Sequence, residues 1–130
     1  MERILVVDDE RPVRETMGLL LRQEGYRVVV AECGHTAVSA IETFTFDVVI
    51  VDIVMPGMDG LETIAILRQD APDVSIIAMS GYAFGSGLTE TDFFRSAMER
   101  GATCCLRKPF SRDQLVDAIT FCRVSKAMVA

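Results

Sequence analysis

The sequence predicts an α/β fold in which five parallel strands form a doubly wound sheet that is covered by five helices. Five short apolar runs alternate with five stretches in which apolar residues recur at helical spacing. Most of these runs are continuously apolar rather than alternating, as expected for parallel strands covered on both faces. Parallel neighbours need crossover helices, and a chain of 130 residues has the length of one such domain.

The predicted strands are short and most of them are rich in Val and Ile, which suit the interior of a sheet. They are expected at Ile4–Val7, Val28–Ala31, Val48–Val51, Ser75–Met79 and Thr103–Leu106.

The first helix is predicted by Val13, Met17 and Leu21, which recur on one helical face. Pro12 suits its first turn, and Gly25 can end it. The helix therefore lies between the first two strands, as the fold requires.

Capping residues mark two of the later helices. Asp59 can cap the third helix, with Glu62 three residues further on. Ser111 and Gln114 form a capping-box pattern for the fifth. The second and fourth helices are predicted by their apolar faces alone, which are Ala37, Val38 and Ile41, and Phe93, Phe94, Ala97 and Met98.

The composition narrows the range of functions. A formal net charge of −6 disfavours direct binding to nucleic acid, which relies on Lys and Arg facing phosphate. No run approaches the roughly 20 apolar residues that span a bilayer, and Met1-Glu2-Arg3 leads straight into a predicted strand. No membrane association and a cytoplasmic location are therefore expected. The cysteines are then better explained as small buried side chains than as disulfides: Cys33, Cys104, Cys105 and Cys122.

Polar side chains follow four of the predicted strands at their carboxyl ends. Asp8 and Asp9 follow the first strand and Asp52 the third, while Ser80 and Lys108 follow the fourth and fifth. Doubly wound sheets bind ligands outside the carboxyl ends of their strands. We therefore expect these five side chains to form one site.

The chemistry of such a site points to phosphoryl transfer. Three crowded carboxylates repel one another unless a cation lies between them, and oxygen ligands with open positions suit Mg²⁺. Lys108 and Ser80 could each bind a phosphoryl oxygen. Asp52, on the central strand, is the best candidate for a nucleophile toward phosphorus.

These residues lie in motifs that resemble those of the receiver domain of two-component response regulators, over essentially the whole chain. The resemblance implies a flavodoxin-like fold with strand order 2-1-3-4-5. It also implies a receiver domain over residues 1–125, with a C-terminal tail at 126–130 and no output domain. The matching motifs are Val6-Val7-Asp8-Asp9-Glu10, Val51-Asp52-Ile53-Val54-Met55-Pro56-Gly57-Met58-Asp59-Gly60, Ser80-Gly81-Tyr82 and Lys108-Pro109-Phe110.

The resemblance further implies what this site does. Asp52 would accept a phosphoryl group from a phosphohistidine on a sensor histidine kinase or histidine phosphotransfer protein, and the domain would signal to a downstream protein partner rather than turn over a substrate. Lys108 and Ser80 would contact the phosphoryl group. The implied ligands of Mg²⁺ (or Mn²⁺) are Asp9, Asp52, the backbone carbonyl of Val54 and, through water, Asp8.

The sequence departs from the family pattern in two places. Cys105 stands where the family usually has an aromatic residue three positions before the lysine, so a different read-out is expected. The segment after Ser80 is also longer than usual. Its Tyr82 and Phe84 could form a mobile lid or a partner contact that phosphorylation orders, or they could pack onto the fourth helix. Ser80, Tyr82, Phe84 and Cys105 are thus the candidate read-out residues.

Two other functional classes fit the sequence less well. An aspartyl-nucleophile phosphatase of similar fold has a second Asp two residues after the nucleophile, where this chain has Val54. A binding module independent of phosphorylation would normally lack part of the acid set, which is complete here. Neither Val54 nor Tyr82, two residues after Ser80, can orient attacking water, so a long-lived phosphoryl group is predicted.

Overall fold

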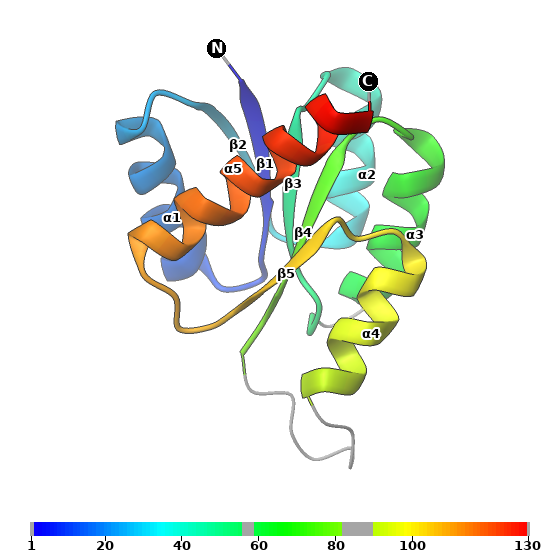
Figure 1. Ribbon diagram of the computed structural model, residues 1–130. Coiled ribbons are helices and arrows are strands. Elements are labelled where there is room, and N and C mark those ends of the chain that lie inside the picture. Colours follow the sequence, from blue (N-terminus) through cyan, green and yellow to red (C-terminus); the bar gives the residue numbers. More distant parts are fainter. Residues whose placement is uncertain (1, 56–58, 82–89, 130) are drawn as a thin grey trace.

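Five parallel strands lie between two layers of helices in the computed structural model (Figure 1). The structure describes residues 2–55, 59–81 and 90–129. The strand order is β2-β1-β3-β4-β5, which confirms the predicted flavodoxin-like sheet. The strands are β1 (Arg3–Val7), β2 (Arg27–Ala31), β3 (Val48–Asp52), β4 (Ser75–Ser80) and β5 (Cys104–Arg107).

The helices divide between the two faces of the sheet. Figure 1 shows α1 and α5 on one face and α2, α3 and α4 on the other. α5 continues to Val129, so residues 126–129, which the sequence analysis assigned to a tail, are helical. The helices are α1 (Arg11–Gln23), α2 (Gly34–Thr43), α3 (Gly60–Asp70), α4 (Glu90–Arg100) and α5 (Arg112–Val129).

The core has two halves because successive strand residues point to opposite faces. In β1, Ile4 and Val6 pack with residues of α1 and α5, whereas Leu5 and Val7 pack with residues of α2, α3 and α4. β3 is buried along its whole length. Coverage on both faces therefore explains why these strands read as continuous apolar runs.

The predicted caps are present at two helix starts. The Asp59 carboxylate accepts a hydrogen bond from the Glu62 N–H at 2.8 Å. Ser111 and Gln114 bond reciprocally, with 2.8 Å from the Ser111 N–H to the Gln114 side chain and 3.1 Å from the Gln114 N–H to the Ser111 hydroxyl. These local bonds fix where α3 and α5 begin, immediately after the loops that follow β3 and β5.

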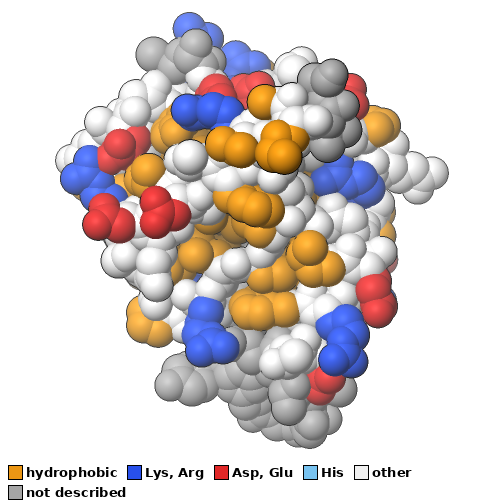
Figure 2. Space-filling model, viewed as in Figure 1, with side chains coloured by type: hydrophobic (Ala, Val, Ile, Leu, Met, Phe, Trp, Pro, Cys, Tyr) orange, Lys and Arg blue, Asp and Glu red, His pale blue; other side chains and the backbone are white. Residues whose placement is uncertain are grey.

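The outer surface of α5 carries exposed apolar side chains. Figure 2 shows hydrophobic side chains gathered down the face on which α5 lies in Figure 1. On α5 itself the exposed ones are Phe121, Val124 and Met128. Their spacing of three and four residues places them on one side of the helix, away from the buried Leu115 and Ile119.

Candidate functional site

Sheet register brings the acids of two strands together. Val7 of β1 pairs with Val51 of β3, so Asp8 and Asp52, which follow them, lie at neighbouring positions. Both side chains are buried, with Asp52 only 4% exposed. Two carboxylates withdrawn from water at adjacent positions need a compensating positive charge.

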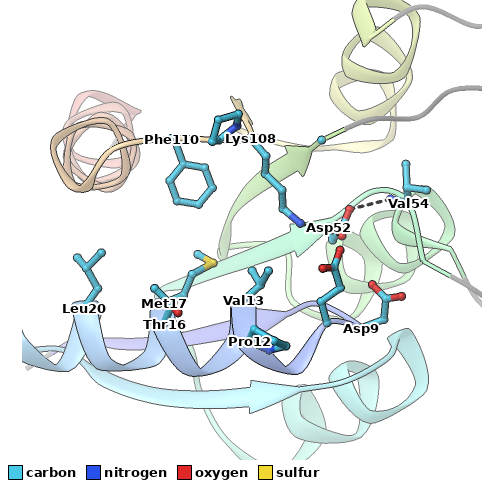
Figure 3. A pocket seen from close by; sticks show the side chains of 13 residues that line it. Asp9, Pro12, Val13, Thr16, Met17, Leu20, Asp52, Val54, Lys108 and Phe110 are labelled. Carbon is cyan, nitrogen blue, oxygen red and sulfur yellow. Dashed lines mark hydrogen bonds and ion pairs between the residues drawn. The ribbon is translucent and has the colours of Figure 1, made fainter.

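Lys108 supplies that charge. Its Nζ lies 2.7 Å from Asp8 Oδ2 and 3.1 Å from Asp52 Oδ2, reaching between them as Figure 3 shows for Asp52. Burial acts to lower the pKa of Lys108, but the hydrogen bond that Lys108 donates to Asp8 and the charges of Asp52 and Asp8 outweigh it and raise the pKa. The structure thus joins three predicted site residues through one charged ammonium.

The remaining oxygens of the two buried acids are held by the backbone. Asp8 Oδ1 accepts a hydrogen bond from the Glu10 N–H at 2.9 Å, and Asp52 Oδ1 accepts one from the Val54 N–H at 3.0 Å. Arg14 donates from Nη1 to the Asp8 backbone carbonyl at 2.8 Å. Both carboxylates are therefore fixed in orientation. The backbone group of Val54 that bonds to Asp52 is its N–H, so the Val54 carbonyl is not used in this contact.

The environment of Asp52 makes its carboxyl a weaker acid than usual. Burial raises its pKa to about 6, and the charge of Asp8 adds to this effect. The Val54 N–H and the charge of Lys108 act in the opposite direction and keep the pKa from rising further. A pKa of about 6 leaves the group mainly ionised near neutral pH and more basic than an ordinary aspartate, which suits a nucleophile.

Three acids form a cluster at the mouth of the site. One carboxylate oxygen from each of Asp8, Asp9 and Glu10 lies within 4.8 Å of the others. Asp9 and Glu10 are exposed, and within residues 2–55, 59–81 and 90–129 nothing hydrogen-bonds to the Asp9 carboxylate. An all-oxygen donor set with a free carboxylate fits a hard divalent cation. Glu10 was not among the predicted ligands, although its place directly after the acid pair Asp8-Asp9 is the signal that could have indicated it.

Ser80 reaches the site through its backbone. The residue is fully buried at the end of β4, and its carbonyl accepts a hydrogen bond from the Lys108 N–H at 2.8 Å. Its hydroxyl donates to the Gly81 carbonyl at 3.2 Å. The Ser80 backbone is thus bonded to that of Lys108, whereas the Ser80 hydroxyl is bonded to its own loop.

Of the other candidate read-out residues, only Cys105 lies in the described part of the chain; Tyr82 and Phe84 lie outside it. Cys105 is partly buried against α4, where its Sγ donates to the Phe94 carbonyl at 3.8 Å. Burial raises the pKa of this thiol to about 11, so it stays protonated. Its environment is that of a small core side chain.

Gly60 is a site-forming residue that the sequence analysis did not single out. A Cβ at this position would overlap the backbone of Asp52 and Ile53. The Gly60 N–H also donates to the Ile53 carbonyl at 3.1 Å. Its position directly after the capping residue Asp59 carried no sign of this contact, which arises from how α3 packs on the end of β3.

An open cavity of about 690 Å³ extends from the acids along α1. Figure 3 shows Val13, Met17 and Leu20 on the α1 side and Phe110 opposite them, with Asp52 and Lys108 at one end. The cavity therefore joins a charged end to an apolar trough.

A family model described as response regulator receiver domain matches residues 4–120. The chain belongs to this family. It is a receiver domain of the kind that serves phosphorylation-based two-component signalling. The sequence resemblance is thereby confirmed.

Curated relatives of the receiver domain include proteins of two sizes. Sporulation initiation phosphotransferase F of Bacillus subtilis is 30% identical over 118 residues, which are 91% of this chain and 90% of that protein. Response regulator MprA of Mycolicibacterium vanbaalenii is 35% identical over 114 residues, which are 88% of this chain but 47% of that protein. The chain thus spans about half the length of MprA, and equally of the DNA-binding response regulator MtrA of Mycobacterium tuberculosis.

Solved structures agree with the fold. A response regulator receiver domain protein from Clostridium thermocellum superimposes with a TM-score of 0.85 at 26% identity, over 100% of both chains. Chemotaxis protein CheY4 of Vibrio cholerae gives a TM-score of 0.80 at 28% identity, over 92% of this chain and 97% of that one. No helix in the described ranges of this receiver domain is long and apolar enough to cross a membrane.

Proposed function

We propose that Asp52 of this receiver domain accepts a phosphoryl group from a phosphohistidine on a sensor histidine kinase or histidine phosphotransfer protein, and that the domain then signals to a downstream protein. The observation that carries this proposal is the contact of Lys108 Nζ with both Asp8 and Asp52. One ammonium holds a candidate nucleophile beside a cluster of metal-binding acids. That arrangement suits transfer of an anionic group better than it suits structural packing alone.

The site residues would divide the work of the transfer. An oxygen of Asp52 attacks phosphorus, the bond from phosphorus to the histidine nitrogen breaks, and that nitrogen keeps the bonding electrons. Lys108 moves from the carboxylates to a phosphoryl oxygen, which it can do because its Nζ is bound only by charge and hydrogen bonds. Ser80 donates its hydroxyl to another oxygen once it turns from the Gly81 carbonyl.

Mg²⁺ or Mn²⁺ would be held at the acid cluster. Asp9 is the first choice for direct coordination because its carboxylate is exposed and has no other bond within the described chain. Asp8 is already bonded to Lys108 and Glu10, so coordination through water suits it. Asp52 and the Val54 carbonyl would complete the protein ligands. When bound, the cation would offset the negative charge of the carboxylates and of the phosphoryl oxygens.

The phosphohistidine donor would dock over the apolar trough. A histidine on a partner has to reach the Asp52 carboxylate from solvent, and the cavity beside it is lined by apolar side chains of α1 and by Phe110. An apolar helix face carrying the histidine has the matching chemistry. Val54 offers no acid or base beside Asp52, which favours a signalling domain over a turnover enzyme.

Acetyl phosphate with Mg²⁺ tests the proposal directly. Intact-mass spectrometry should detect one phosphoryl adduct on the unchanged chain and none on Asp52→Asn. Asp59→Asn is the matched control because Asn also caps α3, and it should be phosphorylated normally. Asp9→Asn should need much more Mg²⁺ for the same adduct yield. An adduct on Asp52→Asn equal to that of the unchanged chain would refute the assignment.

A further inference from the structure

Two cysteines of the receiver domain meet at a place unrelated to the phosphoacceptor site. Cys104 is the first residue of β5 and faces α5, where Cys122 projects back toward it. Their Sγ atoms lie 4.0 Å apart. Cys105, the next residue of β5, faces the other side of the sheet and contacts α4 instead. Cys104 and Cys122 therefore pair where β5 packs against α5, and Cys105 takes no part in the pair.

The two thiols differ in their surroundings. Cys104 is partly exposed, so a small oxidant in solution can reach it, whereas Cys122 is 1% exposed. Cys122 nevertheless borders a second cavity of about 280 Å³ that Ser75, Arg123 and Lys126 also line. This cavity leaves its side chain room to rotate.

The hydrogen bond between the two thiols shifts their pKa values in opposite directions. The hydrogen bond with Cys122 lowers the pKa of Cys104 against the opposing effect of burial. The same hydrogen bond, together with burial, raises the pKa of Cys122. Cys104 is thus the more nucleophilic sulfur at neutral pH, and Cys122 is held directly beside it.

We propose that Cys104 and Cys122 are an oxidisable pair that a peroxide converts into an intramolecular disulfide joining β5 to α5. Closing the gap from 4.0 Å to an S–S bond of about 2 Å needs each sulfur to move by roughly 1 Å, which side-chain rotation can supply. Disulfides of this kind in reducing compartments are transient and respond to oxidants.

The reaction balances with one peroxide. The Cys104 thiolate attacks a peroxide oxygen, an S–O bond forms, the O–O bond breaks and hydroxide leaves, which gives a sulfenic acid. The sulfur of Cys122 then attacks Sγ of Cys104, the S–S bond forms and the S–O bond breaks. The thiol protons leave with the two hydroxides as two molecules of water. Two thiols lose two electrons, and the peroxide gains them.

The disulfide would fix α5 against the sheet. Cys122 follows Phe121 directly, so the cross-link lies under the exposed apolar surface of α5 seen in Figure 2. It closes a loop from residue 104 to residue 122, and in the chain-entropy model this constraint on the unfolded chain raises the thermal midpoint by on the order of 10 °C. Reduction would reverse the shift.

The double variant Cys33→Ser/Cys105→Ala isolates the pair, because Ser also suits the start of α2 and Cys105 contacts a different helix. Hydrogen peroxide added to the folded protein should remove two hydrogens from its mass, and digestion should give one peptide pair linked through Cys104 and Cys122. The thermal midpoint should rise and then return after a reductant is added. Adding Cys104→Ala or Cys122→Ala to this variant should abolish both changes.

Peptide mapping of the unchanged chain keeps the test decisive if a variant folds poorly. The proposal is overturned if oxidation adds oxygen to the cysteines without linking them, if it produces only disulfides between two chains, or if the Cys104–Cys122 link forms only in denaturant.

Discussion

Gly60, the first residue of α3, lies directly against the backbone of Asp52, the last residue of β3. A side chain on Gly60 would overlap the Asp52 carbonyl oxygen and the Ile53 α-carbon, and the Gly60 N–H is bonded to the Ile53 carbonyl. The end of the central strand and the start of α3 are therefore packed backbone to backbone. The position of Asp52, the proposed nucleophile, therefore depends on the lack of a Cβ atom at Gly60.

Gly60→Ala should therefore move Asp52 and destabilise the domain. Because backbone rather than a flexible side chain blocks the new methyl group, we expect the free energy of unfolding to fall by about 1–3 kcal/mol, with slower phosphorylation by acetyl phosphate. Urea denaturation and intact-mass kinetics would measure the two effects. Gly81→Ala is the control, since among residues 2–55, 59–81 and 90–129 a Cβ there meets only the Lys108 side chain, at 3.5 Å or more. Equal stability of the two variants would contradict the packing argument.

The ionisation of Asp52 should make stability depend on pH. Burial raises the pKa of this carboxyl from 3.8 to about 6, so the folded state binds its proton more tightly than the unfolded state. The associated stability is present below the unfolded pKa and is lost as pH rises through about 6. In metal-free buffer Asp52→Asn should match the unchanged domain near the acid end and exceed it by about 1–3 kcal/mol at neutral pH. If the free energies of unfolding of the two proteins ran parallel over this pH interval, the pKa of Asp52 would not be raised in the folded domain.

Lys108→Ala should weaken the metal-free domain and strengthen its response to Mg²⁺. Without the ammonium, Asp8 and Asp52 face each other as buried charges, which should cost about 1–3 kcal/mol of unfolding free energy. A divalent cation can take over the lost positive charge, so Mg²⁺ should raise the thermal midpoint of the variant more than that of the unchanged domain. The chain's other lysine, Lys126, is exposed, and Lys126→Ala serves as the control. A smaller Mg²⁺ shift in Lys108→Ala would argue against competition between the lysine and the cation.

Val54→Asn should shorten the lifetime of the phosphoryl group on Asp52. The Val54 side chain is 43% exposed and borders the same cavity as Asp52. An amide there can orient a water molecule toward phosphorus, whereas an isopropyl group cannot, so hydrolysis should be several-fold faster in the variant. The decay of the adduct mass after removal of acetyl phosphate measures this, with Val54→Leu as the apolar control. Faster decay in the unchanged domain than in Val54→Asn would reverse the argument.

Much of the fold could be predicted because burial on both faces leaves a plain trace in the sequence. The apolar runs located all five strands to within about one residue at each end, and the side chains of Asp59 and Ser111 marked two helix starts. The strand order came from the family resemblance, since five similar parallel strands do not themselves specify their neighbours. The predicted tail at 126–130 was wrong for residues 126–129, because the segment after residue 125 contains no Gly or Pro and α5 continues through it.

The candidate site was predictable for those side chains whose closeness to one another depends only on their following the carboxyl ends of strands in one sheet. Asp8 and Asp52 follow the neighbouring strands β1 and β3, and Lys108 follows β5, which lies beyond β4 in the same parallel sheet. The structure brings the charged groups of all three into contact. The hydrogen bond from Ser80 to Gly81 depends on a side-chain rotation that no sequence pattern encodes. The approach of Cys104 to Cys122 likewise depends on how α5 is rotated against β5, so four cysteines without regular spacing gave no hint of a pair.

The charges around Lys108 have a consequence for how the receiver domain would handle information. Asp8, Asp9, Glu10 and Asp52 are four carboxylates, whereas Lys108 and the Arg14 guanidinium on the Asp8 carbonyl are two cations, which leaves a formal net charge of −2 at the place where an anionic phosphoryl group must arrive. Without Mg²⁺, a phosphohistidine donor is repelled by the negative charge of the site. Without a donor, Mg²⁺ brings no phosphoryl group to transfer. The domain would thus behave as a coincidence detector that responds only when both inputs are present. The concentration of free Mg²⁺ would then determine how much phosphorylation a given amount of active kinase produces.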